Sequence, residues 1–286
     1  MASPAPAIPV PGDLPAQVER AIAEDLGSGD LTAALIAPGT RGRATVITRE
    51  AAVLCGTPYV AATFARLDPA VRLDWRAAEG ARVGAGDPLF TAEGPARALL
   101  TGERTALNFL QLLSGVATAT RAFADRLAGT RCRLLDTRKT IPGLRTAQKY
   151  AVRVGGGCNH RIGLYDGILI KENHIVAAGS IANAVARARA SGAAVPVEVE
   201  VENLEELRAA IAARADIVML DDFPLETLRE AVAVNAASAR PAKLEASGGV
   251  SLETVRAIGE TGVDYVSVGG ITKHVRAIDL SMRFDW

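Results

Sequence analysis

Apolar and polar positions divide the chain into two parts with different rhythms. In the first part, residues 14–26 have the spacing of a short amphipathic helix, and apolar residues recur at helical spacing again from Thr101 to about Leu127. Strand-like or turn-rich β segments are predicted between these helices at residues 43–56, 71–76 and 79–90. The first 110–115 residues therefore predict a small α+β domain that ends in a helix.

In the second part, short apolar runs recur, each bounded by polar residues, and alanine-rich stretches with helical spacing separate most of them. The runs cover residues 133–136, 167–171, 195–200, 216–221, 242–246 and 264–268, and the helical stretches cover 180–190, 204–213, 225–234 and 252–259. Strand–helix alternation predicts a parallel sheet, and so many units in succession favour an α/β barrel, complete or partial. A doubly wound sheet stays open as an alternative, although no Gly-x-Gly-x-x-Gly follows the first strand.

Polar or glycine residues stand at the end of every one of these runs. They are Asp136-Thr137-Arg138-Lys139, Lys171, Glu200, Asp221, Ser247-Gly248-Gly249 and Gly269-Gly270. In a barrel these positions lie at the carboxyl ends of the strands, where active sites form. A solvated rim would explain one such residue, but the whole set predicts a catalytic pocket.

Basic residues outnumber acidic residues in the segment from Asp136 to Lys171, although the net charge of the chain is zero. Arginine binds planar carboxylates and phosphates through two parallel hydrogen bonds, so the segment predicts a small, strongly anionic ligand. A solvated helix surface explains Lys149 and Arg153 better. The cations expected to bind the ligand are Arg138, Lys139, Arg161 and Lys171.

Two acidic residues and two glycine pairs complete the expected site. Glu200 and Asp221 end adjacent runs, where their oxygens suit Mg²⁺ or a developing positive charge, and ion pairing with Lys171 or Lys139 is the alternative. The pairs at 248–249 and 269–270 follow the last two runs. Glycine lets backbone N–H groups approach an anion closely, so a phosphate site is predicted there.

Composition excludes several classes of protein. A net charge of zero argues against a general nucleic-acid or membrane-surface binder, and 4% aromatic residues argue against a base-stacking platform. No apolar stretch is long enough for a transmembrane helix, and the Pro/Ala-rich start lacks the basic region of a signal peptide. The 3 scattered cysteines favour a reducing cytosol over a disulfide framework or a zinc site.

The motifs at these positions resemble the quinolinate phosphoribosyltransferase family. The most specific are residues 138–143 (RKTIPG) and 159–164 (NHRIGL). Further matching segments, in family order over nearly the whole chain, are 24–32, 102–108, 169–174, 198–200, 219–221, 245–249 and 268–270. Two departures are small: Glu172 stands where Asp is usual, and Asp222 stands where Asn is usual.

The resemblance implies transfer of a phosphoribosyl group from phosphoribosyl pyrophosphate to quinolinate with decarboxylation, giving nicotinate mononucleotide, pyrophosphate and CO₂ in NAD biosynthesis, with Mg²⁺. It implies an N-terminal α/β sandwich domain over residues 1–114 and an incomplete, TIM-like α/β barrel of six or seven strands over 115–274. The tail, 275–286, is expected to return to the first domain. The implied assembly is a cytoplasmic homodimer, or a higher oligomer of dimers, in which one subunit covers the barrel mouth of the other.

The same resemblance assigns roles residue by residue. Substrate-binding positions are Arg104 (from the neighbouring subunit), Thr137, Arg138, Lys139, His160, Arg161, Lys171, Glu200 and Asp221. The catalytic residues among them are Lys139, Lys171, Glu200 and Asp221, and the last two are expected to hold the metal directly or through water. Phosphate-binding positions are Ser247, Gly248, Gly249, Val268, Gly269 and Gly270.

Three other functions stay open at this point. Another phosphate-binding barrel enzyme, such as an isomerase or aldolase, would need a catalytic Lys or Glu in apolar surroundings, whereas Lys171 lies among charged residues. A non-catalytic paralogue linked to molybdate transport would lack the full set of cations for a dicarboxylate. A nicotinate phosphoribosyltransferase would need fewer cations, because its substrate carries one carboxylate.

Overall fold

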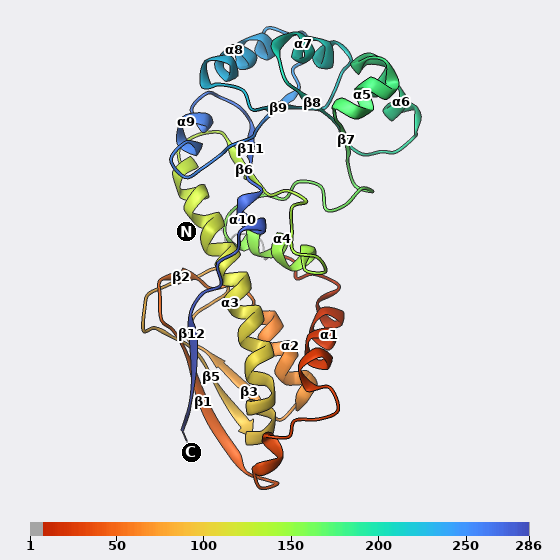
Figure 1. Cartoon of the computed structure of the whole chain (residues 1–286). Coiled ribbons are helices and arrows are strands. Elements are labelled where there is room, and N and C mark those ends of the chain that lie inside the picture. Colours follow the sequence, from red (N-terminus) through yellow and green to blue (C-terminus); the bar gives the residue numbers. More distant parts are fainter. Residues whose placement is uncertain (1–7, 286) are drawn as a thin grey trace. The chain divides into compact units, whose positions relative to one another are not determined.

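The computed structural model describes residues 8–285. It separates into two compact units whose sequences interleave (Figure 1). Unit 1 comprises the chain up to Arg121 together with Thr140–Gly156 and the residues from Ile271 onward, and unit 2 comprises Ala122–Lys139 and Gly157–Gly270. The long helix α3 (Ala96–Leu127) begins in unit 1, continues without a break through residues 114 and 115, and has its last residues in unit 2.

Unit 1 is built on an antiparallel sheet with the strand order β12-β1-β5-β3. Its strands are β1 (Arg41–Thr48), β3 (Arg72–Trp75), β5 (Pro88–Pro95) and β12 (Leu280–Asp285), and a separate small sheet pairs β2 (Ala52–Val53) with β4 (Arg82–Val83). Leu280 of the C-terminal strand lies opposite Thr48 of β1. The C-terminal segment of the described chain thus returns to a sheet formed by its first half.

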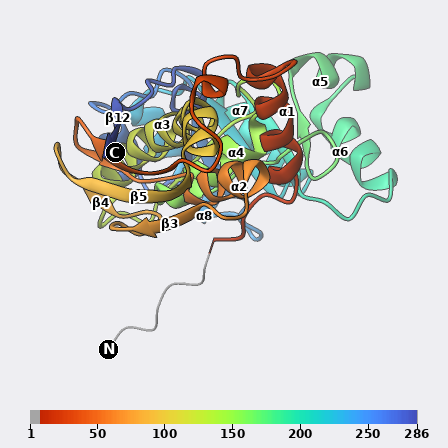
Figure 2. The ribbon, with the colours of Figure 1, turned by 90° about the horizontal axis from the view of Figure 1, so that it is seen from below.

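Helices cover one face of this sheet (Figures 1 and 2). The helices of unit 1 are α1 (Leu14–Leu26), η1 (Ala33–Leu35), α2 (Thr57–Leu67), the larger part of α3, α4 (Arg145–Val154) and, from Ile271, α10 (Gly270–Lys273). Val46 and Phe90 of the sheet pack in one apolar core with Phe64 of α2 and Leu107 of α3, and all are nearly inaccessible to solvent. Helix α2 was not expected from the sequence pattern.

Unit 2 contains, within residues 8–285, a parallel sheet of six strands in the order β6-β11-β10-β9-β8-β7. The strands are β6 (Arg133–Leu135), β7 (Ile168–Ile170), β8 (Val197–Val201), β9 (Ile217–Asp221), β10 (Lys243–Ser247) and β11 (Tyr265–Ser267). The helices between them are α5 (Glu172–Ala178), α6 (Ile181–Ala190), α7 (Leu204–Ala212), α8 (Leu225–Ala236) and α9 (Val255–Gly259). Strands β6 and β7 are the two edges of the sheet, so the barrel is open. The predicted incomplete α/β barrel with a smaller α/β domain is confirmed.

Alternation along the strands decides which side chains face the barrel interior. In β8, Val197, Val199 and Val201 are almost fully buried, as expected on the face that packs against the surrounding helices. The intervening Glu198 and Glu200 line cavities inside the barrel. The sequence Val-Glu-Val-Glu-Val therefore gives this strand one apolar and one acidic face.

The expected solvent exposure of Lys149 is wrong. Lys149 is 1% exposed in α4, whose Ala147, Gln148, Tyr150 and Ala151 are also buried. Gln148 donates a hydrogen bond from Nε2 to the carbonyl of Thr272 at 2.9 Å and accepts one at Oε1 from the backbone N–H of Ile141 at 2.8 Å. Packing thus surrounds α4 on most sides, which its own sequence does not reveal, whereas Arg153 on the same helix is exposed.

Candidate active site

A cavity of about 430 Å³ opens in unit 2 where the strands of the parallel sheet end. Its lining residues are Thr137, Arg138, Lys139, His160, Arg161, Leu169, Lys171, Glu200, Met219, Asp221, Glu245, Ser247 and Ser267. Most come from the carboxyl ends of β6, β7, β8, β9 and β10 or from the loops that follow. The structure thus gathers almost all the predicted substrate-binding residues in one place.

Two arginines give this cavity its positive character. The Nε of Arg138 is buried and has no hydrogen-bond partner, while Arg161 donates from one terminal nitrogen to the carbonyl of Gly167 at 3.0 Å. Burial lowers the pKa of Arg161, and the positive charge of Arg138 lowers it further. The two positive charges repel each other, and Arg138 has a buried N–H donor without a partner. Both features favour an anionic ligand that binds the two guanidinium groups.

The acidic residues of the cavity lie near this charge. Lys171 forms an ion pair with Glu200 across the ends of β7 and β8, so the ion pairing considered for Glu200 is present. The side chain of Lys171 is 49% exposed and that of Glu200 is 18% exposed, so both remain accessible to a ligand. Asp221 ends β9, the strand next to β8, and lines the same cavity.

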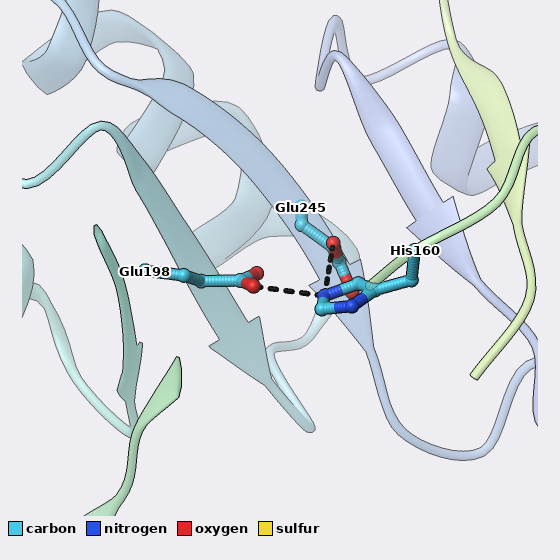
Figure 3. A group of neighbouring side chains, drawn as sticks. All are labelled: His160, Glu198 and Glu245. Carbon is cyan, nitrogen blue, oxygen red and sulfur yellow. Dashed lines mark hydrogen bonds and ion pairs between the residues drawn. The ribbon is translucent and has the colours of Figure 1, made fainter. Parts of the chain in front are cut away.

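A buried carboxylate shapes the loop that carries His160 and Arg161. Asp136 is inaccessible to solvent at the end of β6 and accepts hydrogen bonds from the side-chain amide of Asn159 at 2.6 Å and the backbone N–H of His160 at 2.9 Å. The ring of His160 contacts Glu198 through Nε2 at 2.8 Å (Figure 3). Its Nδ1 accepts a hydrogen bond from the backbone N–H of Arg161 at 2.8 Å. Arg161 therefore follows a loop that is anchored from inside the barrel.

Local packing by itself explains why glycine stands at two of the predicted phosphate-binding positions. Gly248 has φ +96°, and a side chain there would overlap the carboxylate of Asp222. A Cβ on Gly269 would lie 3.0 Å from Cδ of Lys139 and 3.3 Å from the hydroxyl oxygen of Thr137. Asp222 has φ +55°, a conformation that Asp and Asn adopt more readily than most residues, so the departure from Asn at this position is conservative.

The comparisons with known proteins agree with this geometry. Residues 30–114 match the family model "Quinolinate phosphoribosyl transferase, N-terminal domain", and residues 116–283 match the corresponding C-terminal domain model. The chain belongs to the quinolinate phosphoribosyltransferase family.

Members of this family resemble the chain over nearly its whole length. The "probable nicotinate-nucleotide pyrophosphorylase [carboxylating]" of Bacillus subtilis is 45% identical over 260 residues, which cover 91% of this chain and 89% of that protein. The nicotinate-nucleotide pyrophosphorylase [carboxylating] of Mycobacterium leprae is 43% identical and covers 93% and 95%. The solved structure of the nicotinate-nucleotide pyrophosphorylase from Francisella tularensis has 47% identity and a TM-score of 0.92, with coverage of 97% and 98%.

Several site residues predicted from the family do not line the cavity. Of the predicted phosphate-binding residues, all within the part of the chain described here, Ser247 is in the lining, but Gly248, Gly249, Val268, Gly269 and Gly270 are not. Arg104 lies in α3, in unit 1, where its side chain is 57% exposed and lies 3.6 Å from a carboxylate oxygen of Glu103. Their assigned roles stay predictions.

The residue roles taken from the family resemblance did not include several residues that the structure places at the site. Leu169, Met219, Glu245 and Ser267 line the cavity, and Glu198 contacts His160 just inside the barrel. The alternation in residues 197–201 was a usable signal for Glu198, because it puts this residue on the same face of the strand as Glu200. Met219 begins a matching family segment, but its position between Glu200 and Glu245 follows only from strand pairing.

Proposed function

We propose that this protein transfers the phosphoribosyl group of phosphoribosyl pyrophosphate to quinolinate and releases pyrophosphate and CO₂, which yields nicotinate mononucleotide for NAD biosynthesis. The observation that carries the proposal is the pair Arg138 and Arg161 in the cavity, with a buried guanidinium donor unused. Family membership and the names of the relatives support the same reaction.

Quinolinate fits the charges of the cavity because it carries two carboxylates on one planar ring. Arg138 and Arg161 can each offer a carboxylate two parallel N–H donors, and Lys139 adds a third cation to the lining. A monocarboxylate would leave part of this positive charge uncompensated in a partly buried site. The cavity therefore supports a dicarboxylate substrate over nicotinate.

The acidic residues suit the other half of the reaction. When the bond between the ribose carbon and pyrophosphate breaks, positive charge develops on the sugar, and Asp221 and Glu200 provide negative charge at the strand ends. The pyridine nitrogen attacks this carbon and becomes cationic. The bond to the adjacent carboxylate then breaks, CO₂ leaves, and the electron pair stays on the ring carbon beside the positive nitrogen until a proton is added.

We also propose that Glu200 and Asp221 hold Mg²⁺. Mg²⁺ prefers oxygen ligands and retains water, and two carboxylates ending adjacent strands in one solvent-accessible cavity fit that preference. When bound, the ion would neutralise charge on the departing pyrophosphate. In this structure the ion pair with Lys171 compensates the negative charge of Glu200.

The remaining family features extend the proposal to the assembled protein. We propose a cytoplasmic homodimer in which Arg104 of one subunit binds a substrate carboxylate in the other, and in which the loops at 247–249 and 268–270 hold the 5′-phosphate of the donor. The free state of Cys55, Cys132 and Cys158 is consistent with a reducing compartment. None of the helices within residues 8–285 has the length and apolarity needed to cross a membrane.

One assay tests the reaction directly. Purified protein is mixed with phosphoribosyl pyrophosphate, Mg²⁺ and either quinolinate or nicotinate, and both CO₂ and the nucleotide product are measured. We expect equimolar CO₂ and nicotinate mononucleotide from quinolinate only. Product from nicotinate with none from quinolinate would overturn the assignment.

A further inference from the structure

Three polar side chains meet inside the barrel, just beneath the proposed substrate cavity. They are His160 from the loop after Cys158, Glu198 from β8 and Glu245 from β10, and Figure 3 shows them pointing toward one another. Their side chains are 12%, 5% and 0% exposed, respectively. A second cavity of about 420 Å³ lies on the other side of the cluster, where β6, β7, β9 and β11 begin at Arg133, Ile168, Ile217 and Tyr265.

The hydrogen bonds of His160 determine where its proton lies. Nδ1 accepts from the backbone N–H of Arg161 at 2.8 Å, so this nitrogen carries no proton. The ring proton is therefore on Nε2, which donates to Oε2 of Glu198 at 2.8 Å. His160 is thus a neutral ring in a defined tautomer, and both of its nitrogens are engaged within the protein.

This arrangement argues against a metal ion at the cluster. One His and two carboxylates whose ligand atoms lie within 4.8 Å of one another have a suitable composition for a divalent cation. A histidine that binds a metal through one nitrogen normally donates a proton from the other to an acceptor. Here Nδ1 faces a donor, so Nε2 cannot lose its proton without leaving the ring anionic.

The two glutamates need a proton between them. Both carboxylate oxygens of Glu245 and Oε1 of Glu198 are buried without a hydrogen-bond partner. Burial raises the pKa of Glu245 well above its usual value, the negative charge of Glu198 raises it further, and a smaller interaction with Ser267 opposes them. A carboxylic acid at Glu245 supplies the missing donor, because a carboxylate oxygen of Glu198 lies within 4.8 Å of one of Glu245 and the two side chains are placed to share a hydrogen bond.

We propose that Glu245 is a neutral acid that donates a hydrogen bond to Glu198, and that the chain Glu245–Glu198–His160 positions Arg161 to bind a substrate carboxylate. This inference rests on the proposed function, since it explains how the site is made ready for quinolinate. Glu198 and Glu245 act as positioning residues, and His160 acts through the backbone of Arg161. Nothing in the family motifs that identified the site assigns a role to either glutamate.

Substitutions at Glu245 test whether this residue acts as a hydrogen-bond donor. Glu245→Gln keeps an N–H donor toward Glu198, so we expect KM for quinolinate and KM for phosphoribosyl pyrophosphate to stay within about threefold of wild type. Glu245→Met has similar length but no donor, and we expect KM for quinolinate to rise about tenfold or more, with KM for phosphoribosyl pyrophosphate little changed. Glu202→Gln, at an exposed position after β8, serves as the matched control.

A measurement on the unmodified protein keeps the proposal testable if a variant does not fold. Long-range ¹⁵N–¹H spectra of ¹⁵N-histidine-labelled protein distinguish the two neutral tautomers, and His160→Gln assigns the signal among the 3 histidines. We expect the Nε2–H tautomer. In equilibrium dialysis with Mn²⁺ and with Zn²⁺, wild type and Glu245→Met should bind the same amount of metal.

Four results would overturn the proposal: an Nδ1–H tautomer, metal binding that depends on Glu245, unchanged KM for quinolinate in folded Glu245→Met, or equal losses in Glu245→Gln and Glu245→Met. The spectra require no turnover. They therefore test the hydrogen-bond chain independently of activity. If the wild-type protein fails to consume quinolinate, that failure refutes the proposed reaction and not the hydrogen-bond chain.

Discussion

Individual arginines in this chain differ in what balances their charge. Arg189 and Arg256 each contact a carboxylate oxygen at 2.6–2.8 Å at the surface, where such pairs contribute little to stability. Arg138 instead has a buried Nε with no partner. Burying a charged donor without a partner costs free energy, so its retention at this position is best explained by a ligand that satisfies it.

The first prediction concerns the geometry of that arginine. Arg138→Lys keeps the charge but removes the planar pair of N–H donors, so we expect KM for quinolinate to rise by roughly one to two orders of magnitude. KM for phosphoribosyl pyrophosphate should change much less. Arg133→Lys, on the preceding strand but lining the opposite cavity, is the control and should behave like wild type. Equal changes in both variants would contradict a specific role for Arg138.

Two adjacent aspartates allow a matched test of charge. Asp221→Asn removes a negative charge from the cavity, and we expect kcat to fall by about two orders of magnitude or more while quinolinate binding, measured alone by calorimetry, survives. Asp222→Asn should be nearly neutral, because Asn also tolerates the positive φ of this residue. Near-normal turnover in Asp221→Asn would make Asp221 a structural residue.

At the scale of elements, the loops after β9 and β10 pack against each other through Gly248. Asp222 donates its backbone N–H to the carbonyl of Ser247 at 2.9 Å, which leaves no room for a side chain on Gly248. A substitution at Gly248 therefore disturbs packing whether or not a phosphate binds there. Gly249 has φ +54° and only one atom within reach of a Cβ, at 4.0 Å.

We expect Gly249→Ala to cost about 1–3 kcal/mol of unfolding free energy, from its backbone conformation alone. Gly248→Ala should cost more, because it adds a steric overlap to a similar backbone penalty. Urea unfolding of both variants measures the difference. If folded Gly249→Ala also raises KM for phosphoribosyl pyrophosphate, the phosphate role gains support that Gly248 variants cannot provide.

The starting ends of β6, β10 and β11 are joined by Asp264. Its carboxylate accepts hydrogen bonds from the backbone N–H of Leu244 at 3.0 Å, from Lys243 at 2.9 Å and from Arg131 at 2.6 Å. Burial raises its pKa, but the hydrogen bonds from Lys243, Leu244 and Arg131 outweigh burial and leave the pKa below its usual value. Stabilisation by a carboxylate with a lowered pKa is present above the pKa of the unfolded chain and is lost as pH falls through the folded value.

Asp264→Asn should therefore be destabilised by about 1–3 kcal/mol at neutral pH. The difference from wild type should begin to shrink below about pH 4, because the carboxylate is protonated first in the unfolded chain and then, at lower pH, in the folded protein. Unfolding in urea at neutral pH and at about pH 3 measures both values. A difference that grows toward acid would contradict the assigned ionic role.

At the scale of the whole molecule, the prediction is that active sites are shared between subunits. Arg104→Ala and Lys139→Ala should each be folded, dimeric and nearly inactive. After subunit exchange at equal mixing, half of the dimers are mixed, and each mixed dimer has one site free of both substitutions. Activity should then recover toward about a quarter of wild type. A mixture that stays inactive despite demonstrated exchange would show that Arg104 does not act across subunits.

Much of this protein was predictable from local sequence. Alternating and helical periodicities are properties of short segments, because a strand or helix must bury one face, and they located all six strands of the barrel and most of its helices. Charges at strand ends are equally local, and in a parallel sheet the topology itself brings them together. Thus the sequence alone assigns Arg138, Lys171, Glu200 and Asp221 to one site.

Burial and hydrogen-bond partners depend on segments far apart in the chain, and only the tertiary structure decided them. Lys149 is buried because packing encloses α4, not because of its neighbours in sequence. Glu198 and Glu245 become a pair only because β8 and β10 flank β9 in the barrel. The sequence determined which charged residues stand at the strand ends that form the site, whereas the fold decided which groups there lose water and must find partners, because desolvation depends on every atom around a group.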